Sequence, residues 1–126
     1  MPPDVTDAEL SVLQVLWDQG QATLRQLAEV LYPGKPLAGA QATVAKLLER
    51  LEAKQCIARE RTASPQLFRA TVRKPDLIGW RLESVANQLC EGSWSPLLTT
   101  LVKTGKLSAR ERKELASLLN DVTRSR

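Results

Sequence analysis

The sequence predicts a mainly α-helical fold with a small β-hairpin: a winged helix-turn-helix followed by a C-terminal helical dimerisation region. Residues 1–74 contain three amphipathic helical patterns and then a short basic hairpin pattern, which is the order of a winged helix. Residues 75–126 contain three further helical patterns, rich in leucine, and Ser108 and Glu111 have the spacing of a capping box at the start of the last one. We therefore expect two domains, a winged-helix DNA-binding domain at 1–74 and a three-helix dimerisation region at 75–126.

The first two helices are indicated by their caps. Thr6 and Glu9 have the spacing of a capping box, in which the threonine hydroxyl accepts from the glutamate amide and the glutamate side chain reaches back. Apolar residues then recur at helical spacing over residues 7–18, and Gly20 ends the helix. Thr23 is expected to cap a second helix, which a Pro- and Gly-rich loop follows.

The third helix, expected from about residue 39 to residue 54, has one narrow apolar stripe. Four apolar side chains fall within roughly 100° of one another on a helical wheel, and they are Val44, Leu47, Leu48 and Leu51. The opposite face carries Ala42, Lys46, Glu49 and Ala53. A helix with alanines on its outer face can approach another surface closely, as a helix in a DNA major groove must.

A strongly basic hairpin follows this helix. Residues 57–61 and 66–70 are expected to be strands, joined by a turn at 62–65. Residues 54–74 contain six cations and one acid, a net charge of +5, whereas the whole chain carries +4. This concentration favours an anionic partner. A solvated surface hairpin that happens to be basic is the alternative.

Candidates for reading bases lie near the start of the third helix. Gln41, Thr43 and Lys46 carry an amide, a hydroxyl and an ammonium group that can meet base edges. Thr43 could instead only help to start the helix, and Lys46 could be solvated. Arg50 lies on the flank, where it can contact a phosphate or pair with an acid of the first helix such as Glu9.

Candidates for phosphate contacts lie on either side of that helix. Thr23 and Arg25, at the start of the second helix, can hold a phosphate through helix-end amides and the guanidinium group. A plain capping role for Thr23 is the alternative. Arg59, Arg61 and Arg69 on the hairpin are expected to meet backbone phosphates, which supplies affinity but little sequence information.

The C-terminal region is expected to complete its core with a second copy of the chain. About 50 residues in three short helices cannot bury so many large apolar side chains on their own. The alternative is that the region folds back on the first domain. The residues expected at the dimer contact are Trp80, Val85, Leu89, Trp94, Leu98, Leu101, Leu115, Leu118 and Leu119.

Composition argues against several other functions. The chain has no histidine, no glycine-rich phosphate loop and no cysteine pair at metal-binding spacing, so we expect no enzyme, metal or cofactor. It has no apolar run long enough for a membrane span and no signal-peptide core, so a cytoplasmic location is expected. Cys56 and Cys90 are read as small buried hydrophobes. A thiol-responsive regulator and a winged-helix protein-interaction module remain alternatives.

The chain resembles a known family. Residues 6–17 resemble the opening helix of the penicillinase-repressor and methicillin-repressor family, which includes copper-transport repressors. The pairs Thr43-Val44, Leu47-Leu48 and Arg50-Leu51, with Lys54, fit its recognition-helix pattern. Residues 91–93 and the leucine-rich end are similar to its dimerisation region. The resemblance implies a homodimeric transcriptional repressor of an inverted-repeat duplex operator, often with TACA and TGTA half-sites.

The chain departs from this family at its known switches. Members are commonly released by cleavage of an Asn-Phe bond or by a metal signal at a C-terminal cysteine cluster, and this chain has neither feature. Gln55 and Cys56 stand where a glycine and an apolar residue are usual, and Gln41-Ala42 precede Thr43 where members often have Tyr-Thr. An upstream sensor or protease, if there is one, is therefore unknown.

Overall fold

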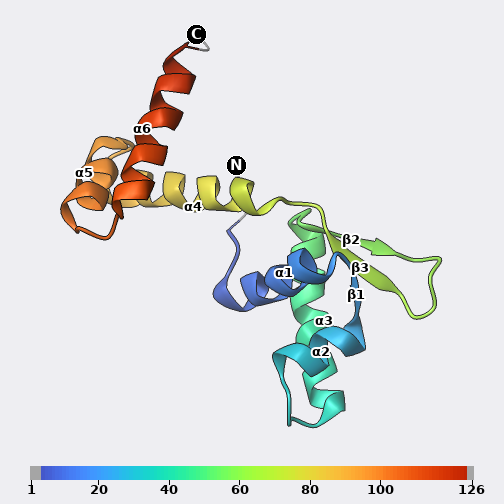
Figure 1. Ribbon diagram of the computed structural model, residues 1–126. Helices are drawn as coiled ribbons and strands as arrows, with labels where there is room; N and C mark the ends of the chain where they lie inside the picture. The colour runs from blue at the N-terminus through green and yellow to red at the C-terminus, as the bar shows by residue number, and fades with distance from the viewer. Residues whose placement is uncertain (1–3, 125–126) are drawn as a thin grey trace. The chain divides into compact units, whose positions relative to one another are not determined.

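The computed structural model describes the backbone of residues 4–124 and the side chains of residues 4–121. Within this part, six helices and a three-stranded antiparallel sheet make a mainly helical fold, and the predicted fold class is confirmed. The chain divides into two compact units, Met1–Gly79 and Trp80–Arg126 (Figure 1). The predicted domain boundary, after residue 74, lies five residues before this division.

The first two helices begin at the predicted cap residues, but only the second has a reciprocal capping box, because the Glu9 carboxylate bonds the Thr6 hydroxyl and Lys54. The Thr6 hydroxyl accepts from the Glu9 amide at 3.2 Å, and α1 (Asp7–Gln19) ends at Gly20, whose φ of 83° suits glycine. Thr23 and Gln26 form a reciprocal capping box at the start of α2 (Leu24–Leu31).

Helix α3 (Leu37–Ala53) packs against α1 and α2 through the predicted stripe (Figure 1). Its buried residues are Ala40, Val44, Leu47, Leu48 and Leu51. The helix starts two residues before the expected position and ends one residue earlier. After it, the amides of Gln55 and Cys56 donate to the carbonyls of Glu52 and Leu51, which closes a Schellman motif.

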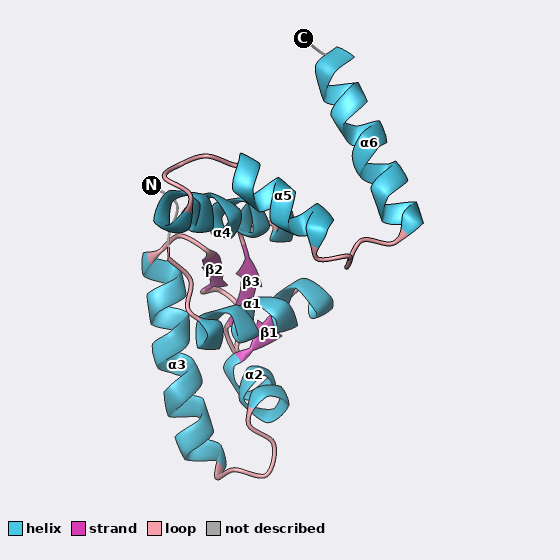
Figure 2. Ribbon diagram, turned by 90° about the vertical axis from the view of Figure 1, so that its left-hand side faces the viewer, coloured by secondary structure: helices cyan, strands magenta, loops and turns pink. Residues whose placement is uncertain are grey.

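The sheet has the order β1-β3-β2. Strands β2 (Ile57–Glu60) and β3 (Leu67–Ala70) form the predicted hairpin, the wing, each one residue shorter at its outer end (Figure 2). The additional strand β1 (Ala22–Thr23) pairs with Phe68 and Leu67 of β3. Two residues cannot show the alternation that signals a strand, so β1 escaped prediction.

The second unit consists of helices. Helix α4 (Lys74–Leu89) begins before this unit and continues into it, and α5 (Ser95–Lys103) and α6 (Ala109–Arg124) follow. The predicted capping box at the start of α6 is present, with the Glu111 amide donating to the Ser108 hydroxyl at 3.1 Å and the Ser108 amide donating to the Glu111 carboxylate at 3.0 Å.

Candidate nucleic-acid interface

The outward face of α3 is exposed over most of its length. Ala42, Thr43, Lys46 and Glu49 are exposed, whereas Gln41 is half-buried. The Thr43 hydroxyl donates to the Gly39 carbonyl at 3.1 Å, so in this structure it bonds the helix backbone. Lys46 has no hydrogen bond or ion pair to any described residue. Of the predicted groove-facing residues, Thr43 and Lys46 are thus exposed and Gln41 is half-buried.

Of the two alternatives for Arg50, the pairing with Glu9 is not found, because Glu9 bonds Lys54 instead. Glu9 is fully buried, and the Lys54 ammonium group donates to both of its carboxylate oxygens at 2.7 Å and to the Asp4 carbonyl at 2.5 Å. Lys54 lies three residues after Leu51 and so continues the buried stripe toward α1. Arg50 is exposed and has no partner among the described residues.

The Glu9–Lys54 pair ties α1 to the end of α3. Burial acts to raise the pKa of Glu9, but hydrogen bonds from Lys54 and Thr6 and the positive charge of Lys54 outweigh it. The pKa of Glu9 therefore lies below its ordinary value of 4.5. The charged form of the pair is thus the stable one near neutral pH, and it fixes the end of α3 against α1.

The three wing arginines lie in different surroundings. The Arg59 side chain is 22% exposed and bonds Glu52 of α3, whereas that of Arg61 is 70% exposed and lies 3.8 Å from the same carboxylate. Arg69 is exposed on β3. Arg61 and Arg69 are therefore accessible to a large anion, and Arg59 is mostly covered.

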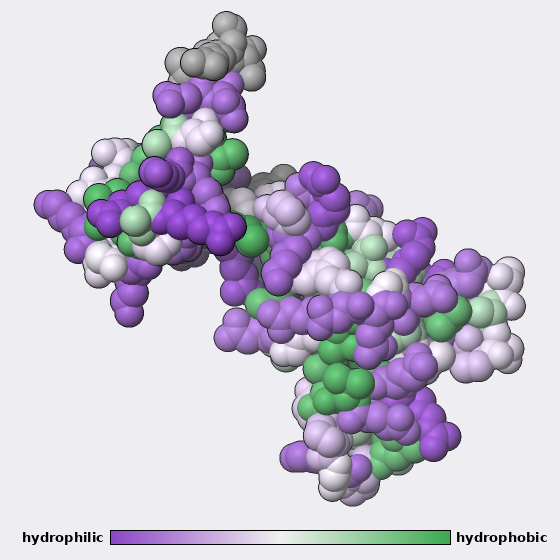
Figure 3. All heavy atoms as spheres, viewed as in Figure 1, coloured by the Kyte–Doolittle hydropathy of each residue, from purple (hydrophilic) through white to green (hydrophobic). Residues whose placement is uncertain are grey.

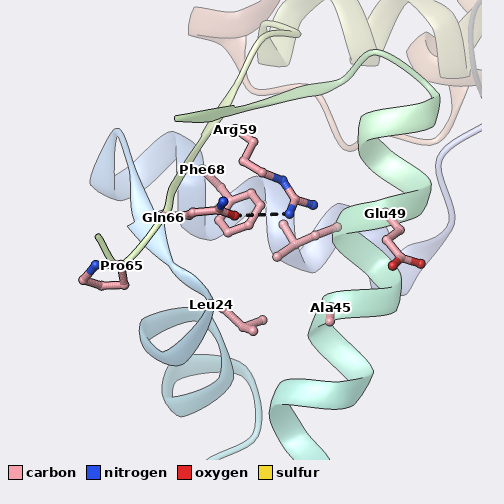
Figure 4. A pocket seen from close by; sticks show the side chains of 8 residues that line it. Leu24, Ala45, Glu49, Arg59, Pro65, Gln66 and Phe68 are labelled. Atoms are coloured by element: carbon pink, nitrogen blue, oxygen red, sulfur yellow. Dashed lines mark hydrogen bonds between the residues drawn. The ribbon is translucent and has the colours of Figure 1, made fainter. Parts of the chain in front are cut away.

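A hollow of about 310 Å³ lies between α3, the wing and the start of α2 (Figure 4). In the figure, the guanidinium group of Arg59 extends into this space from the wing toward α3. The lining residues are Leu24, Ala45, Leu48, Glu49, Arg59, Pro65, Gln66 and Phe68.

At the start of α2 the predicted cap uses the polar atoms of Thr23. Its hydroxyl accepts from the Gln26 amide at 3.1 Å, and its own amide donates to the Gln26 side chain at 2.8 Å. The capping interpretation of Thr23 is confirmed. Arg25 is exposed and pairs with Glu29 at 3.0 Å on the surface.

The second unit exposes most of its apolar side chains. Figure 3 shows green, apolar spheres at the surface beside α5. Trp80 and Leu115 are half-buried. The other residues predicted for the dimer contact are exposed, and they are Val85, Leu89, Trp94, Leu98, Leu101, Leu118 and Leu119.

The two cysteines and Trp17 are explained by their packing and hydrogen bonds. Cys56 is buried, and burial raises the pKa of its thiol, which disfavours the reactive thiolate; Cys90 is half-buried. The Trp17 indole donates to the Val72 carbonyl at 2.9 Å, holding the segment after the wing against α1.

The described residues contain no group of three acidic, histidine or cysteine side chains arranged for a metal ion. No helix within residues 4–124 has the length and apolar content to cross a bilayer.

A helix with an exposed outer face, preceded by a second helix and followed by a basic hairpin, defines the winged helix-turn-helix class. Residues 5–121 match the model of the penicillinase repressor family, so the chain belongs to that family. Its members are DNA-binding transcriptional repressors and not enzymes. The predicted family resemblance is confirmed.

Two curated relatives extend over nearly the whole chain. A penicillinase repressor of Staphylococcus aureus is 21% identical and covers 96% of this chain and 94% of its own length. A penicillinase repressor of Bacillus licheniformis is 22% identical, with coverages of 94% and 91%. Both units of the chain therefore have a counterpart in these relatives.

Sequence reasoning missed two contacts that shape the interface. It offered Arg50 as one possible partner of Glu9, whereas Lys54, three residues after the buried Leu51, bonds that carboxylate. It also assigned no partner to Glu52, which bonds Arg59 of the wing. Strand register could have shown that Arg59 shares a face with Phe68, since the two residues lie opposite each other.

Proposed function

We propose that the chain is a homodimeric repressor that binds an inverted-repeat DNA operator through α3 and the wing. The observation that carries this proposal is the outer face of α3, which is exposed while the opposite stripe is fully packed. Thr43 and Lys46, with Gln41, meet base edges in the major groove, and Arg50 contacts the flanking backbone.

The basic residues around α3 bind the phosphate backbone. Arg61 and Arg69 of the wing and Arg25 of α2 are exposed cations on either side of the proposed recognition helix. In this proposal Thr23 supports the Arg25 contact by capping α2. These contacts add affinity and salt dependence without distinguishing one sequence from another.

The second unit joins two copies of the chain. Its exposed leucines and tryptophans would each contribute about 1.5–3 kcal/mol on full burial, before the cost of ordering the two chains. A two-fold dimer then places its recognition helices on half-sites about one helical turn, or a little more, apart.

The experiment is to select bound fragments from random DNA and to titrate the best duplex at several salt concentrations. Log affinity is expected to fall with log salt with a slope of about 0.9 per phosphate contacted. Lys46→Glu should weaken duplex binding about tenfold or more, since it places a carboxylate against the negatively charged duplex. Lys106→Glu, an exposed residue between α5 and α6, makes the same change in net charge and should alter affinity much less.

Two outcomes would contradict this function. The proposed function would be refuted if the protein bound no duplex even at low salt. Equal losses for Lys46→Glu and Lys106→Glu would mean that only net charge matters, and that α3 does not read DNA. The protein-interaction alternative would then be the better interpretation of the exposed α3 face.

A further inference from the structure

We propose that Arg59 is a positioning residue, a strut inside the protein that fixes the wing against α3, and not a phosphate contact. This inference deepens the proposed function and rests on it where DNA affinity is concerned. It replaces the expectation from sequence that all three wing arginines meet phosphates.

The contacts of Arg59 connect three elements. From β2, its Nη2 donates to Glu52 of α3 at 3.3 Å, and its Nη1 donates at 3.2 Å to Gln66, the residue before β3. The guanidinium group also lies over the ring of Phe68 on β3, with 4.9 Å between Cζ and the ring centroid. A cation over an aromatic face and a charge-assisted hydrogen bond both hold the group in one orientation.

A phosphate has little access to this group. Its side chain is 22% exposed, and its Nε is buried without an acceptor among the described residues. A phosphate at Nη2 would lie beside the Glu52 carboxylate that this nitrogen already bonds, and the two negative groups would repel each other. The structure therefore favours an internal role for Arg59.

Arg61 shows the contrasting case. It lies 3.8 Å from the same carboxylate but is 70% exposed, so it can turn toward solvent without uncovering a buried group. The wing must be held at a suitable distance from α3 for Arg61 and Arg69 to reach the backbone beside the groove. Glu52 and Arg59 supply that constraint.

The decisive variant is Glu52→Gln, because the two roles predict opposite signs. If Arg59 contacted phosphate, Glu52→Gln would free Arg59 and Arg61 from their ion pairs and remove a negative charge near the DNA. The protein would then bind the selected duplex more tightly. If Arg59 is a strut, affinity should fall about tenfold, although the protein has become more positive. Glu83→Gln is the control, since it removes an exposed carboxylate of α4 that has no partner among the described residues. It should bind as tightly as the unmodified protein or more tightly.

A second comparison keeps the positive charge at each position but removes the planar guanidinium group. Arg59→Lys should also lose about tenfold, because a lysine cannot reproduce the planar contacts to Glu52, Gln66 and the ring. Arg61→Lys, at a phosphate contact, should stay within about threefold of the unmodified protein. Equal losses for the two lysine variants would overturn the strut.

A measurement without DNA separates this inference from the proposed function. Trypsin should cleave the free protein after Arg61 faster in Glu52→Gln than in Glu83→Gln, because the wing is released from α3. Unchanged cleavage would refute the strut, whether or not the protein binds DNA. Faster cleavage in a protein that ignores every duplex would support the strut and refute the repressor function.

Discussion

At the scale of single residues, Glu9 is a charged side chain that is buried inside the first unit. It is fully buried, accepts from the hydroxyl of Thr6 at 3.0 Å, and pairs with Lys54. Removing one partner of a buried ion pair leaves the other charge uncompensated. Replacing Glu9 alone is therefore expected to destabilise the fold and the packing of α1 against the end of α3.

Glu9→Gln should lower the free energy of unfolding by about 2 kcal/mol at pH 7. The folded pKa of Glu9 lies below that of the unfolded chain, so the ionised group stabilises the fold above the ordinary pKa of 4.5. This contribution is lost as the pH falls through the folded pKa. Urea titrations at pH 7 and below pH 4 should show the difference between the two proteins shrinking in acid.

The control for this prediction is Glu29→Gln. Glu29 forms an exposed pair with Arg25, and such pairs contribute about 0–1 kcal/mol. If Glu9→Gln cost no more than Glu29→Gln at pH 7, the buried pair would have no stabilising role.

At the scale of elements, the end of α3 carries a conformational cost. Gln55 has a φ of 62°, in the left-handed region that glycine adopts readily. Its carbonyl also accepts from the Thr71 hydroxyl at 3.0 Å, which connects this turn to the residue after β3. The turn is thus fixed by contacts that do not involve the Gln55 side chain.

Gln55→Gly should raise the free energy of unfolding by about 0.5–1 kcal/mol, because it relieves the left-handed strain. Gln55→Ala removes the same side chain without relieving the backbone, and so it should give no comparable gain. Thermal unfolding of the three proteins side by side measures the difference. A stabilisation that is equal in both variants would assign the effect to the side chain instead.

The elements also show what sequence can and cannot predict. The caps at Thr6, Thr23 and Ser108 were predicted because a cap depends on residues three positions apart in one segment. The contacts of Lys54 with Glu9 and of Arg59 with Glu52 depend on how separate segments pack, which periodicity within one segment does not encode. The exposed face of α3 followed from its own stripe, whereas the difference between Arg59 and Arg61 required coordinates.

At the scale of the whole molecule, the two units differ in how they bury apolar residues. The first unit has a packed core that includes Leu13, Leu16 and Leu27. In the second unit Ala86 is buried, but the Leu89 side chain is 80% exposed. A unit with this surface is expected to associate in water.

If the second unit joins two copies as proposed, Leu101→Lys should yield monomers and weaken binding to the selected duplex about tenfold, because two linked half-site contacts become one. Sedimentation velocity measures the assembly state, and the duplex titration measures affinity. Thr99→Lys, an exposed polar position on the same helix, should leave both unchanged. Full operator affinity in a proven Leu101→Lys monomer would show that dimerisation is not needed for binding.

The tryptophans have a spectroscopic consequence. Trp17 belongs to the first unit, where its indole nitrogen bonds Val72, and Trp80 and Trp94 belong to the second. A protein in which the latter two are replaced by phenylalanine would fluoresce from Trp17 alone, and its emission would report melting of the first unit separately. Comparison with far-ultraviolet circular dichroism would then reveal whether the two halves of the chain melt in one cooperative step or in two.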